Sequence, residues 1–206
     1  YEIPKRDWSS DVCSSDLSKG VAIREHVLKI CDPLDGSIDR VIQNYVGCTR
    51  AIDPTITPNS LQRLRCLEGK DDGDQCLSDA QLQTVYSWYS PIKYGYPFAN
   101  GEMDWPGEPV GGEGPQGWLI SQQQPTQETP GGFNAFFRGG LRLENYNGIN
   151  IDVTKDRALL EKSSKLMDTQ NDWTKLLGHG GKMIFYTPGS DILISARAQM
   201  RVYEQA

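Results

Sequence analysis

The sequence contains 206 residues, of which 37% are hydrophobic and 23% charged, and its formal net charge is −6 at pH 7. This composition suits one globular domain, or one and a half with long loops. No run approaches the roughly 18 consecutive apolar residues of a membrane span, and the scattered Lys and Arg residues form no basic patch for a nucleic acid. We therefore expect neither a membrane nor a nucleic acid as a partner.

Residues 1–17 do not follow the pattern of a folded protein. They show no apolar periodicity and contain a serine and aspartate cluster that no helix or strand explains. Back-translated, residues 7–17 match the constant part of a common short-read sequencing adapter, which a disordered polar leader would not produce by chance. We therefore expect residues 1–17, including Cys13, to be a translated adapter that takes no part in the fold.

The first half of the remaining chain contains two predicted helices. The apolar spacing of residues 21–30 predicts a short helix, followed by an aspartate-rich loop at residues 31–40. Ser78 and Gln81 have the spacing of a capping box, in which each side chain satisfies a free amide at a helix start. We expect a second helix to begin there and to continue through Tyr89.

The second half alternates between irregular chain and short regular elements. Residues 94–148 are rich in glycine, proline, aromatic and amide side chains, which predicts a long irregular region. Helices are predicted at residues 156–167 and 171–177, a buried strand at residues 182–186, and an amphipathic segment at residues 196–204. A strand followed by a turn and a helix is typical of an α/β fold.

The densest group of carboxylates lies between residues 32 and 41. Asp32, Asp35 and Asp39 fall within eight residues, and Gly36 permits a sharp turn. A calcium ion binds about six to eight oxygen atoms, which these carboxylates and the backbone carbonyls of Ser37 and Val41 would supply. The alternative interpretation is a solvated acidic turn, because Asp-Gly pairs also occur for conformational reasons.

The four cysteines outside residues 1–17 fall into two local pairs. Cys31 precedes the first aspartate and Cys48 follows the acidic loop, so a bridge between them would close that loop. Cys66 and Cys76 bracket a short polar loop, where a disulfide fits better than zinc because no histidine lies near. Two local disulfides indicate an oxidising compartment.

The sequence offers one candidate catalytic carboxylate and no complete catalytic set. Asp191 follows the predicted strand directly, where active-site groups collect in α/β sheets, but it could equally cap the helix beginning near Ser195. The two histidines, His26 and His179, lack a plausible serine or cysteine partner, and we expect them to be structural. The chain also lacks a G-x-S-x-G nucleophile motif.

Taken in order, these motifs resemble the tannase and feruloyl esterase family of serine esterases, which includes the mono(2-hydroxyethyl) terephthalate hydrolases. The motifs on which the resemblance rests are C-D-x-x-D-G-x-x-D at residues 31–39, the second cysteine at Cys48, Cys66 with C-L-S-D-A-Q at residues 76–81, and G-G-K-M-I-F-Y-x-x-G-S-D at residues 180–191. The ordered set is more specific than any single motif.

The resemblance implies an α/β-hydrolase core interrupted by a large, irregular, α-rich lid that carries a structural calcium loop. The expected organisation is a lid at residues 18–168 and, at residues 169–206, the last strand, turn and helix of the core. In the family a Cys-Ser nucleophile precedes the lid and a His-Cys follows the acid. Asp191 matches the acid, so the chain is expected to be a fragment that lacks the other two triad residues.

Some positions depart from the family pattern. Arg40 stands where a glycine is usual after the third aspartate. Residues 186–188 read Tyr-Thr-Pro where Tyr-His-Gly is usual. The substrate pocket is expected to come from the aromatic region, although its side chains could instead serve lid packing. The candidates are Trp118, Phe133, Phe136 and Phe137.

The resemblance favours a carboxylic ester hydrolase that forms an acyl-enzyme from a small aromatic or phenolic ester. The parent protein is expected to be secreted or periplasmic, and the fragment alone is expected to be inactive. The alternative hypothesis is a non-catalytic, calcium-dependent binding module on a lid-like scaffold.

Overall fold

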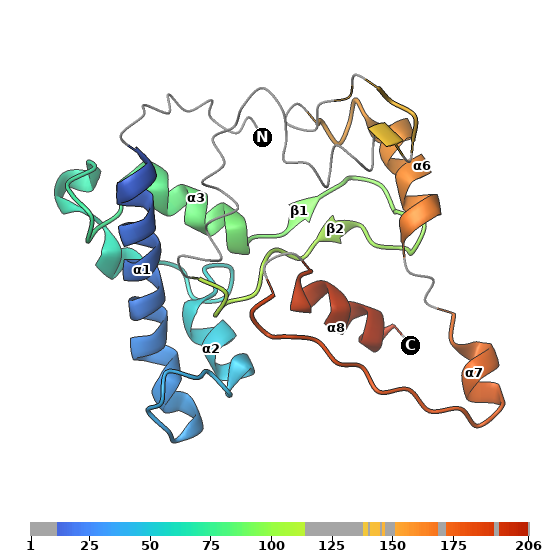
Figure 1. Ribbon diagram of the computed structural model, residues 1–206, viewed down its shortest axis with the longest axis horizontal. Helices are drawn as coiled ribbons and strands as arrows, with labels where there is room; N and C mark the ends of the chain where they lie inside the picture. Colours follow the sequence, from blue (N-terminus) through green and yellow to red (C-terminus); the bar gives the residue numbers. More distant parts are fainter. Residues whose placement is uncertain are drawn as a thin grey trace. The chain divides into compact units, whose positions relative to one another are not determined.

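The chain divides into two compact units, which we call unit 1 and unit 2. Unit 1 comprises Tyr1–Ser90 and Pro109–Gln122, and unit 2 comprises Pro91–Glu108 and Gln123–Ala206 (Figure 1). The computed structural model describes residues 12–113, 138–139, 141–144, 146, 151–168, 172–191 and 194–205. None of the helices within these ranges has both the length and the apolar character needed to cross a lipid bilayer.

The regular elements in the described part of unit 1 are helices and 3₁₀ turns, joined by loops. Its elements are α1 (Val12–Cys31), the 3₁₀ turn η1 (Asp32–Asp35), α2 (Tyr45–Ile52), the 3₁₀ turns η2 (Gln62–Leu64) and η3 (Leu67–Gly69), and α3 (Asp79–Tyr89). The helix predicted at residues 21–30 is therefore confirmed, but α1 begins earlier than expected and includes residues 12–17. An established helix extends at little cost, because each added residue gains one backbone hydrogen bond.

The core of unit 1 lies between the three α-helices. Ile23, Val27 and Cys31 recur at four-residue spacing, so that they share one face of α1 and are buried together. That face packs against side chains from the other elements, which are Cys48, Ile52, Leu61, Leu77, Leu82, Val85, Tyr89 and Val110. Removing these apolar groups from water is the main favourable contribution to the stability of unit 1.

Helix α3 starts at the predicted capping box. The Ser78 hydroxyl accepts from the Gln81 amide at 3.2 Å, and the Ser78 amide donates to the Gln81 side-chain oxygen at 2.8 Å. The helix ends where the Ser90 amide donates to the Tyr86 carbonyl at 3.1 Å. Pro91 follows, and because it has no amide hydrogen it cannot continue the helix.

The chain returns to unit 1 at residue 109, and this segment adds the core residue Val110 and the buried Glu113. Val110 is buried in the core, and Glu113 is 4% exposed. The Tyr89 hydroxyl donates to the Glu113 carboxylate, and the Gly111 amide donates to both carboxylate oxygens at 3.0 and 2.9 Å. The Arg24 guanidinium donates to the Glu113 carbonyl at 3.0 Å. Burial raises the pKa of Glu113, whereas the Tyr89 and Gly111 donors and the Arg24 charge act in the opposite direction.

Unit 2 is built around a short β-hairpin. Its elements are β1 (Ile92–Lys93), β2 (Asp104–Trp105), α6 (Arg157–Met167), α7 (Thr174–Gly178) and α8 (Ala196–Glu204). The strands are antiparallel, with Ile92 opposite Trp105 and Lys93 opposite Asp104. The helices predicted at residues 156–167 and 196–204 are confirmed, whereas the one predicted at residues 171–177 is shorter and starts at residue 174.

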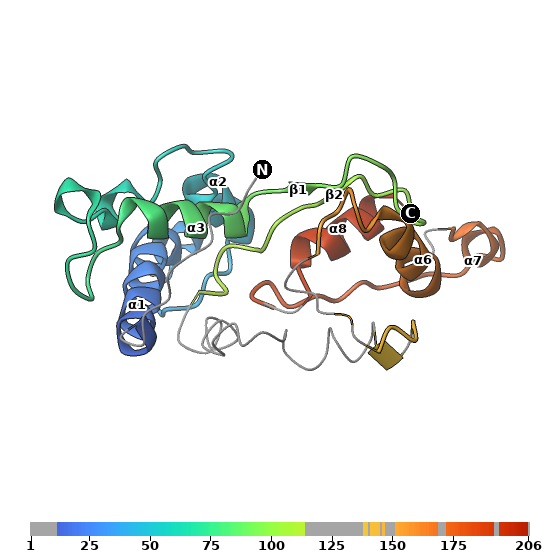
Figure 2. The same cartoon turned by 90° about the horizontal axis from the view of Figure 1, so that it is seen from above.

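Hydrogen bonds from the hairpin hold two of these helices. The Ala99 amide donates to the buried Ser164 hydroxyl of α6 at 2.6 Å. Arg201 of α8 forms ion pairs with Glu102, at 2.9 Å, and with Asp104. The views in Figures 1 and 2 agree with these contacts, since α8 lies along the hairpin in both.

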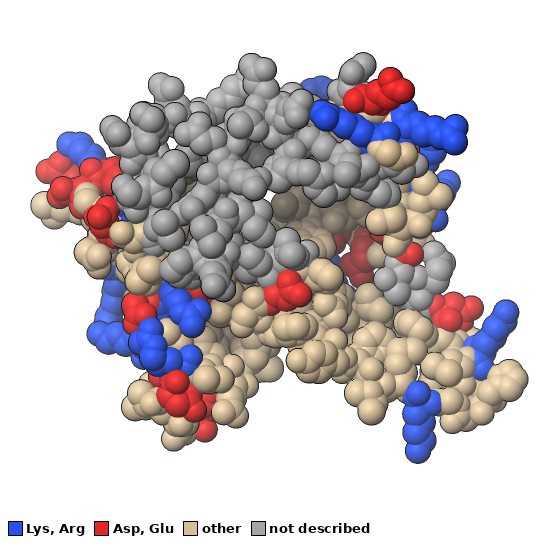
Figure 3. Space-filling view, in the orientation of Figure 1, with Lys and Arg blue, Asp and Glu red and all other residues tan. Residues whose placement is uncertain are grey.

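The strand predicted at residues 182–186 is wrong for this structure. The segment is extended, but among the described residues it has no partner in a β-ladder. Ile184 and Tyr186 are 94% and 86% exposed, and the surface in this region is mostly uncharged (Figure 3). The apolar run indicated a buried strand, but a strand becomes buried only when neighbouring strands and helices cover it.

The inner side of this segment is partly covered. The Phe185 ring makes edge contacts with Trp173 and with Tyr203 of α8, at centroid distances of 5.9 and 5.6 Å. Alternate residues of an extended chain face opposite sides, so Ile184 and Tyr186 face away from Phe185. The segment therefore presents one apolar side to solvent.

Because Glu113 is buried, we expect the free energy of unfolding of unit 1 to fall as pH rises, compared with a variant that lacks this carboxyl group. Because its pKa is raised in the fold, its stabilising contribution is complete below the unfolded pKa and is lost as pH rises through the folded pKa. As pH rises through the folded pKa, the free energy of unfolding of Glu113→Gln should rise relative to that of wild type. The rise should be about 1.4 kcal/mol for each unit by which folding raises the pKa of Glu113. Urea denaturation from pH 4 to pH 8 measures this difference.

The matched control is Glu68→Gln, because Glu68 is an exposed glutamate of the same unit with a side chain 69% accessible. Its free energy of unfolding relative to wild type should not follow the Glu113→Gln curve. A Glu113→Gln difference that stays constant across the pH range would contradict the account.

Candidate functional site

Asp191 lies in the turn that leads into α8, four residues before the N-cap of that helix. It is partly buried, and its Oδ1 accepts from the Ile194 amide at 3.1 Å. The N-cap position of α8 belongs to Ser195. The fully buried Ser195 hydroxyl donates to the Gly107 carbonyl at 2.8 Å, which fixes the start of α8 against the chain that follows β2. Ser195 rather than Asp191 therefore holds the N-cap position, and the catalytic interpretation of Asp191 stays a prediction.

A second carboxylate, Glu108, lies within electrostatic reach of Asp191. Desolvation raises the pKa of Glu108, a hydrogen bond from the Trp105 side chain and the charge of Arg197 lower it, and the charge of Asp191 raises it further. Glu108 was missed at the sequence level because it lies in a segment without periodicity, 83 residues before Asp191.

Both histidines have structural contacts. The His26 ring nitrogen Nε2 lies 3.1 Å from the Ser60 carbonyl, and His179 Nδ1 lies 2.7 Å from the Lys175 carbonyl. Neither contact is with a serine or cysteine side chain. The assignment of Asp191 as a triad acid, which the family resemblance implies, stays a prediction.

The acidic loop at residues 32–41 folds around its own backbone amides. Gly36 ends η1 at φ 91°, a left-handed conformation that glycine adopts readily. The buried Asp32 accepts from the amides of Asp39 and Arg40 at 3.2 and 2.9 Å. The Asp39 carboxylate accepts from the Val41 amide at 3.0 Å. The predicted tight turn is thus present.

Asp35 is the second carboxylate of this loop, and it also binds loop amides. The Gln43 amide donates to Oδ2 at 2.9 Å and the Ser37 amide to Oδ1 at 3.0 Å. These two hydrogen bonds, that of Gln43 first, lower the pKa of Asp35, so its negative charge persists into acidic solution.

The backbone explains the departure from the family pattern at Arg40. This residue has φ 67°, a conformation in which glycine is favoured and a side chain is strained. The guanidinium of Arg40 binds Glu25 of α1, with NH1 lying 3.1 Å from Oε2. Arg40 therefore retains the turn that a glycine would make and adds a contact with α1.

The side chains of the acidic loop do not converge on one point. Over the described ranges, no three His, Cys, Asp or Glu side chains form a group arranged to hold a metal ion. The donor set is nevertheless suited to a hard cation, since it consists of carboxylate and carbonyl oxygens alone. An ion would require Asp35 and Asp39 to exchange loop amides for the metal.

The structure contains both disulfides that the sequence predicts. Cys31 and Cys48 are bonded and fully buried, and they join the end of α1 to α2 across the acidic loop. Cys66 and Cys76 are bonded across the short polar loop. The second pair fixes the loop that precedes α3.

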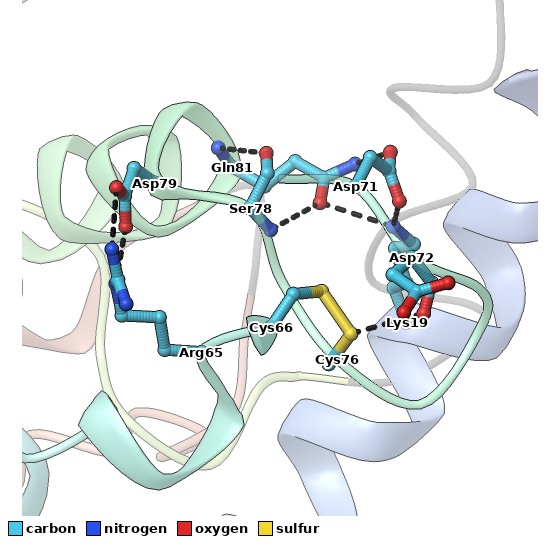
Figure 4. The surroundings of a disulfide bond; sticks show 9 residues. All are labelled: Lys19, Arg65, Cys66, Asp71, Asp72, Cys76, Ser78, Asp79 and Gln81. Carbon is cyan, nitrogen blue, oxygen red and sulfur yellow. Dashed lines mark hydrogen bonds and ion pairs between the residues drawn. A yellow bond between two sulfur atoms is a disulfide. The ribbon is translucent and has the colours of Figure 1, made fainter. Parts of the chain in front are cut away.

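The Cys66–Cys76 loop supplies the partner of a buried lysine. The Lys19 side chain of α1 is 4% exposed, and its ammonium binds the Asp71 carboxylate and the Gln81 side-chain oxygen, the latter at 3.0 Å. Figure 4 shows Asp71 directed towards both Lys19 and Gln81. A buried ammonium without such partners would be costly, so the loop and the capping box act together to stabilise α1.

The predicted substrate-pocket residues lie outside the described part of the chain. This applies to Trp118, Phe133, Phe136 and Phe137. Their assignment stays a prediction.

Comparison with protein families identifies the chain. The family model described as Tannase and feruloyl esterase matches residues 15–206. The chain belongs to the tannase and feruloyl esterase family. The motifs quoted from residues 31–39, 76–81 and 180–191 all fall inside the matched range.

Several curated relatives from this family are similar to the chain. A probable feruloyl esterase B-1 of Aspergillus terreus is 26% identical over 191 residues, covering 88% of this chain and 32% of the relative. The mono(2-hydroxyethyl) terephthalate hydrolase of Piscinibacter sakaiensis is 24% identical over 220 residues, covering 89% and 35%. The chain spans about a third of the length of the curated relatives it matches.

Solved structures agree in fold. An esterase from Aspergillus oryzae superposes with a TM-score of 0.66 at 22% identity, covering 91% of this chain and 34% of the other. Feruloyl esterase B from the same organism gives a TM-score of 0.63 at 19% identity, covering 91% and 35%. The helix-rich units and their few strands thus correspond to part of an esterase fold.

Proposed function

We propose that this chain is part of a secreted or periplasmic carboxylic ester hydrolase acting on small aromatic or phenolic esters, and that Asp191 is its triad acid. The observation that carries the proposal is the place of Asp191. It is partly buried in the turn after an extended apolar segment, and the N-cap position of the following helix belongs to Ser195 instead. The relatives, a probable feruloyl esterase and a mono(2-hydroxyethyl) terephthalate hydrolase, indicate the substrate class.

In this mechanism Asp191 acts through a histidine. Its carboxylate accepts the imidazole N–H, selects the tautomer whose other nitrogen takes the proton of the attacking serine, and stabilises the imidazolium that results. The serine then carries the acyl group until water releases it. The Ile194 amide supports this role because it holds Oδ1 of Asp191 at 3.1 Å.

We propose further that the chain is a piece of the enzyme, with residues 18–168 in the lid and residues 169–206 in the α/β-hydrolase core. The exposed apolar side of residues 182–186 supports this division. Such a side is typical of a strand of a larger sheet, which would cover Ile184 and Tyr186. The two disulfides support export, because structural disulfides persist in oxidising compartments.

The acidic loop is proposed to bind a structural calcium ion through Asp32, Asp35, Asp39 and the carbonyls of Ser37 and Val41. The support is chemical, since three carboxylates lie within one turn and Asp32 is buried. Calcium would offset the repulsion among them and stabilise the loop that the Cys31–Cys48 disulfide closes. No step of the ester chemistry passes through this ion.

Calorimetry on the oxidised chain tests the calcium proposal. Wild type should bind one ion, and Asp35→Ala should weaken binding by at least about tenfold, because it removes a charged ligand. Asp74→Ala is the matched control, since Asp74 belongs to the other acidic loop and is exposed. A chain that shows no calcium binding, or an Asp35→Ala variant that binds as tightly as wild type, would remove the proposal.

Hydrolysis of an aromatic p-nitrophenyl ester tests the catalytic assignment. The 206-residue chain should show no hydrolysis above background, because an acid without its nucleophile and histidine has no chemistry to support. In the longer parent enzyme, Asp191→Asn should lower kcat by about three to four orders of magnitude. Binding of substrate should change much less, so KM serves as the internal control.

Two results would contradict this assignment in different ways. Hydrolysis by the 206-residue chain that persists after treatment with a serine-trapping phosphonate would overturn the mechanism. A fully active Asp191→Asn parent enzyme would move the acid to another carboxylate. Asp172, which accepts from the Thr174 amide at 3.0 Å before α7, would be the next residue to test.

A further inference from the structure

The two disulfides of unit 1 differ in their access to solvent. Cys31 and Cys48 are both fully buried in the core. Cys66 is also buried, but its partner Cys76 is partly exposed. A disulfide is opened by a thiolate that attacks one of its sulfur atoms, so the rate depends on whether that sulfur can be reached. A thiol in solution can therefore approach Sγ of Cys76, whereas the Cys31–Cys48 pair is shielded.

The loop that the exposed disulfide closes carries Asp71 at its midpoint, five residues from each cysteine. One carboxylate oxygen of Asp71 binds the Lys19 ammonium of α1, and the other accepts from Nε2 of Gln81 at 2.8 Å (Figure 4). The Lys19 side chain is almost fully buried, so water cannot replace a lost partner without opening the structure. Asp71 is thus the charge that offsets the burial of Lys19.

The base of the loop is held without the disulfide. The Cys66 amide donates to the Leu77 carbonyl at 2.8 Å, and the Leu77 amide donates to the Leu64 carbonyl at 2.6 Å. These bonds and the capping box at Ser78 involve no sulfur atom, so they remain when the disulfide is reduced.

The tip of the loop depends on the disulfide more strongly. The Asp71 side chain is 54% exposed, so water competes for its carboxylate as soon as the loop is free to move. Reduction restores conformational freedom to the chain between the two cysteines, which raises the entropic cost of keeping Asp71 at Lys19. Reduction should therefore act on α1 through Lys19 and leave the start of α3 in place.

We propose that the Cys66–Cys76 disulfide is a redox-sensitive link between the acidic loop at residues 67–75 and α1, which a dithiol opens while the Cys31–Cys48 disulfide stays closed. Opening the link releases Asp71 from Lys19 and loosens the part of α1 around Lys19. The inference is independent of the proposed ester hydrolysis, since it uses contacts within unit 1 alone.

The exchange reaction balances with the dithiol as the reductant. Its thiolate attacks Sγ of Cys76, the bond between the two cysteine sulfurs breaks, and Cys66 leaves as a thiolate. The second thiol of the reagent then displaces Cys76 and closes a disulfide within the reagent. The two cysteines take up the two protons that the dithiol loses, and the dithiol is oxidised by two electrons.

Stepwise reduction of the folded 206-residue chain tests the selectivity. Free thiols are first blocked, dithiothreitol is added without denaturant, and newly formed thiols are labelled with a second alkylating reagent and located by mass mapping. Cys66 and Cys76 should be labelled at least about tenfold faster than Cys31 and Cys48, because only the former pair has a reachable sulfur. Equal rates for the two pairs, or earlier labelling of Cys31 and Cys48, would overturn the proposal.

Hydrogen exchange before and after this selective reduction tests the link to α1. Amides of residues 19–23 should exchange about tenfold faster after reduction, which is the effect expected from losing one hydrogen bond between charged groups. Amides of residues 82–89 in α3 should keep their protection. Lys19→Met is the matched control, because methionine needs no carboxylate partner, and reduction of this variant should change the exchange of residues 19–23 by less than about twofold.

A double variant gives a second measurement that needs no reductant. Cys66→Ser with Cys76→Ser should reproduce the exchange pattern of the selectively reduced wild type. Unchanged exchange of residues 19–23 in reduced wild type would show that the disulfide does not act on α1. An equal increase in Lys19→Met would show that the effect does not pass through Lys19, and either result would overturn the proposal.

Discussion

The Cys31–Cys48 disulfide is the constraint on which the structure of unit 1 depends. Both cysteines are fully buried, and they join α1 to α2 at the centre of the core. Closing a loop of 17 residues stabilises a fold by about 3 kcal/mol in the chain-entropy description. The bond also fixes the ends of the acidic loop, so the carboxylates of Asp32, Asp35 and Asp39 stay in one turn.

Unit 2 is stabilised by polar contacts between its hairpin and its helices. Its hairpin binds α6 through Ser164 and α8 through Arg201, and the start of α8 is fixed by Ser195. These contacts are polar and specific, and they determine where Asp191 and Glu108 lie. The apolar side chains of Ile184 and Tyr186, by contrast, are exposed.

Local signals in the sequence were sufficient for some elements and not for others. The capping box at Ser78 and both disulfide pairings were predicted correctly, because capping and short-loop bridging depend on residues close in sequence. The strand at residues 182–186 was wrong for this structure, because strand formation depends on partners elsewhere. The buried charges at Lys19 and Glu113 could not be predicted, since burial of a charge follows from tertiary contacts.

Unit 1 has its own disulfide-closed core, and residues 182–186 are proposed to be covered by a larger sheet in the whole enzyme. Hydrogen exchange measured by mass spectrometry on the oxidised chain tests it directly. Amides of α1, α2 and α3 should be protected for hours, and those of residues 182–186 should exchange at the rate of an unprotected peptide. Protection of residues 182–186 equal to that of α1, or loss of protection throughout unit 1 with both disulfides intact, would contradict the account.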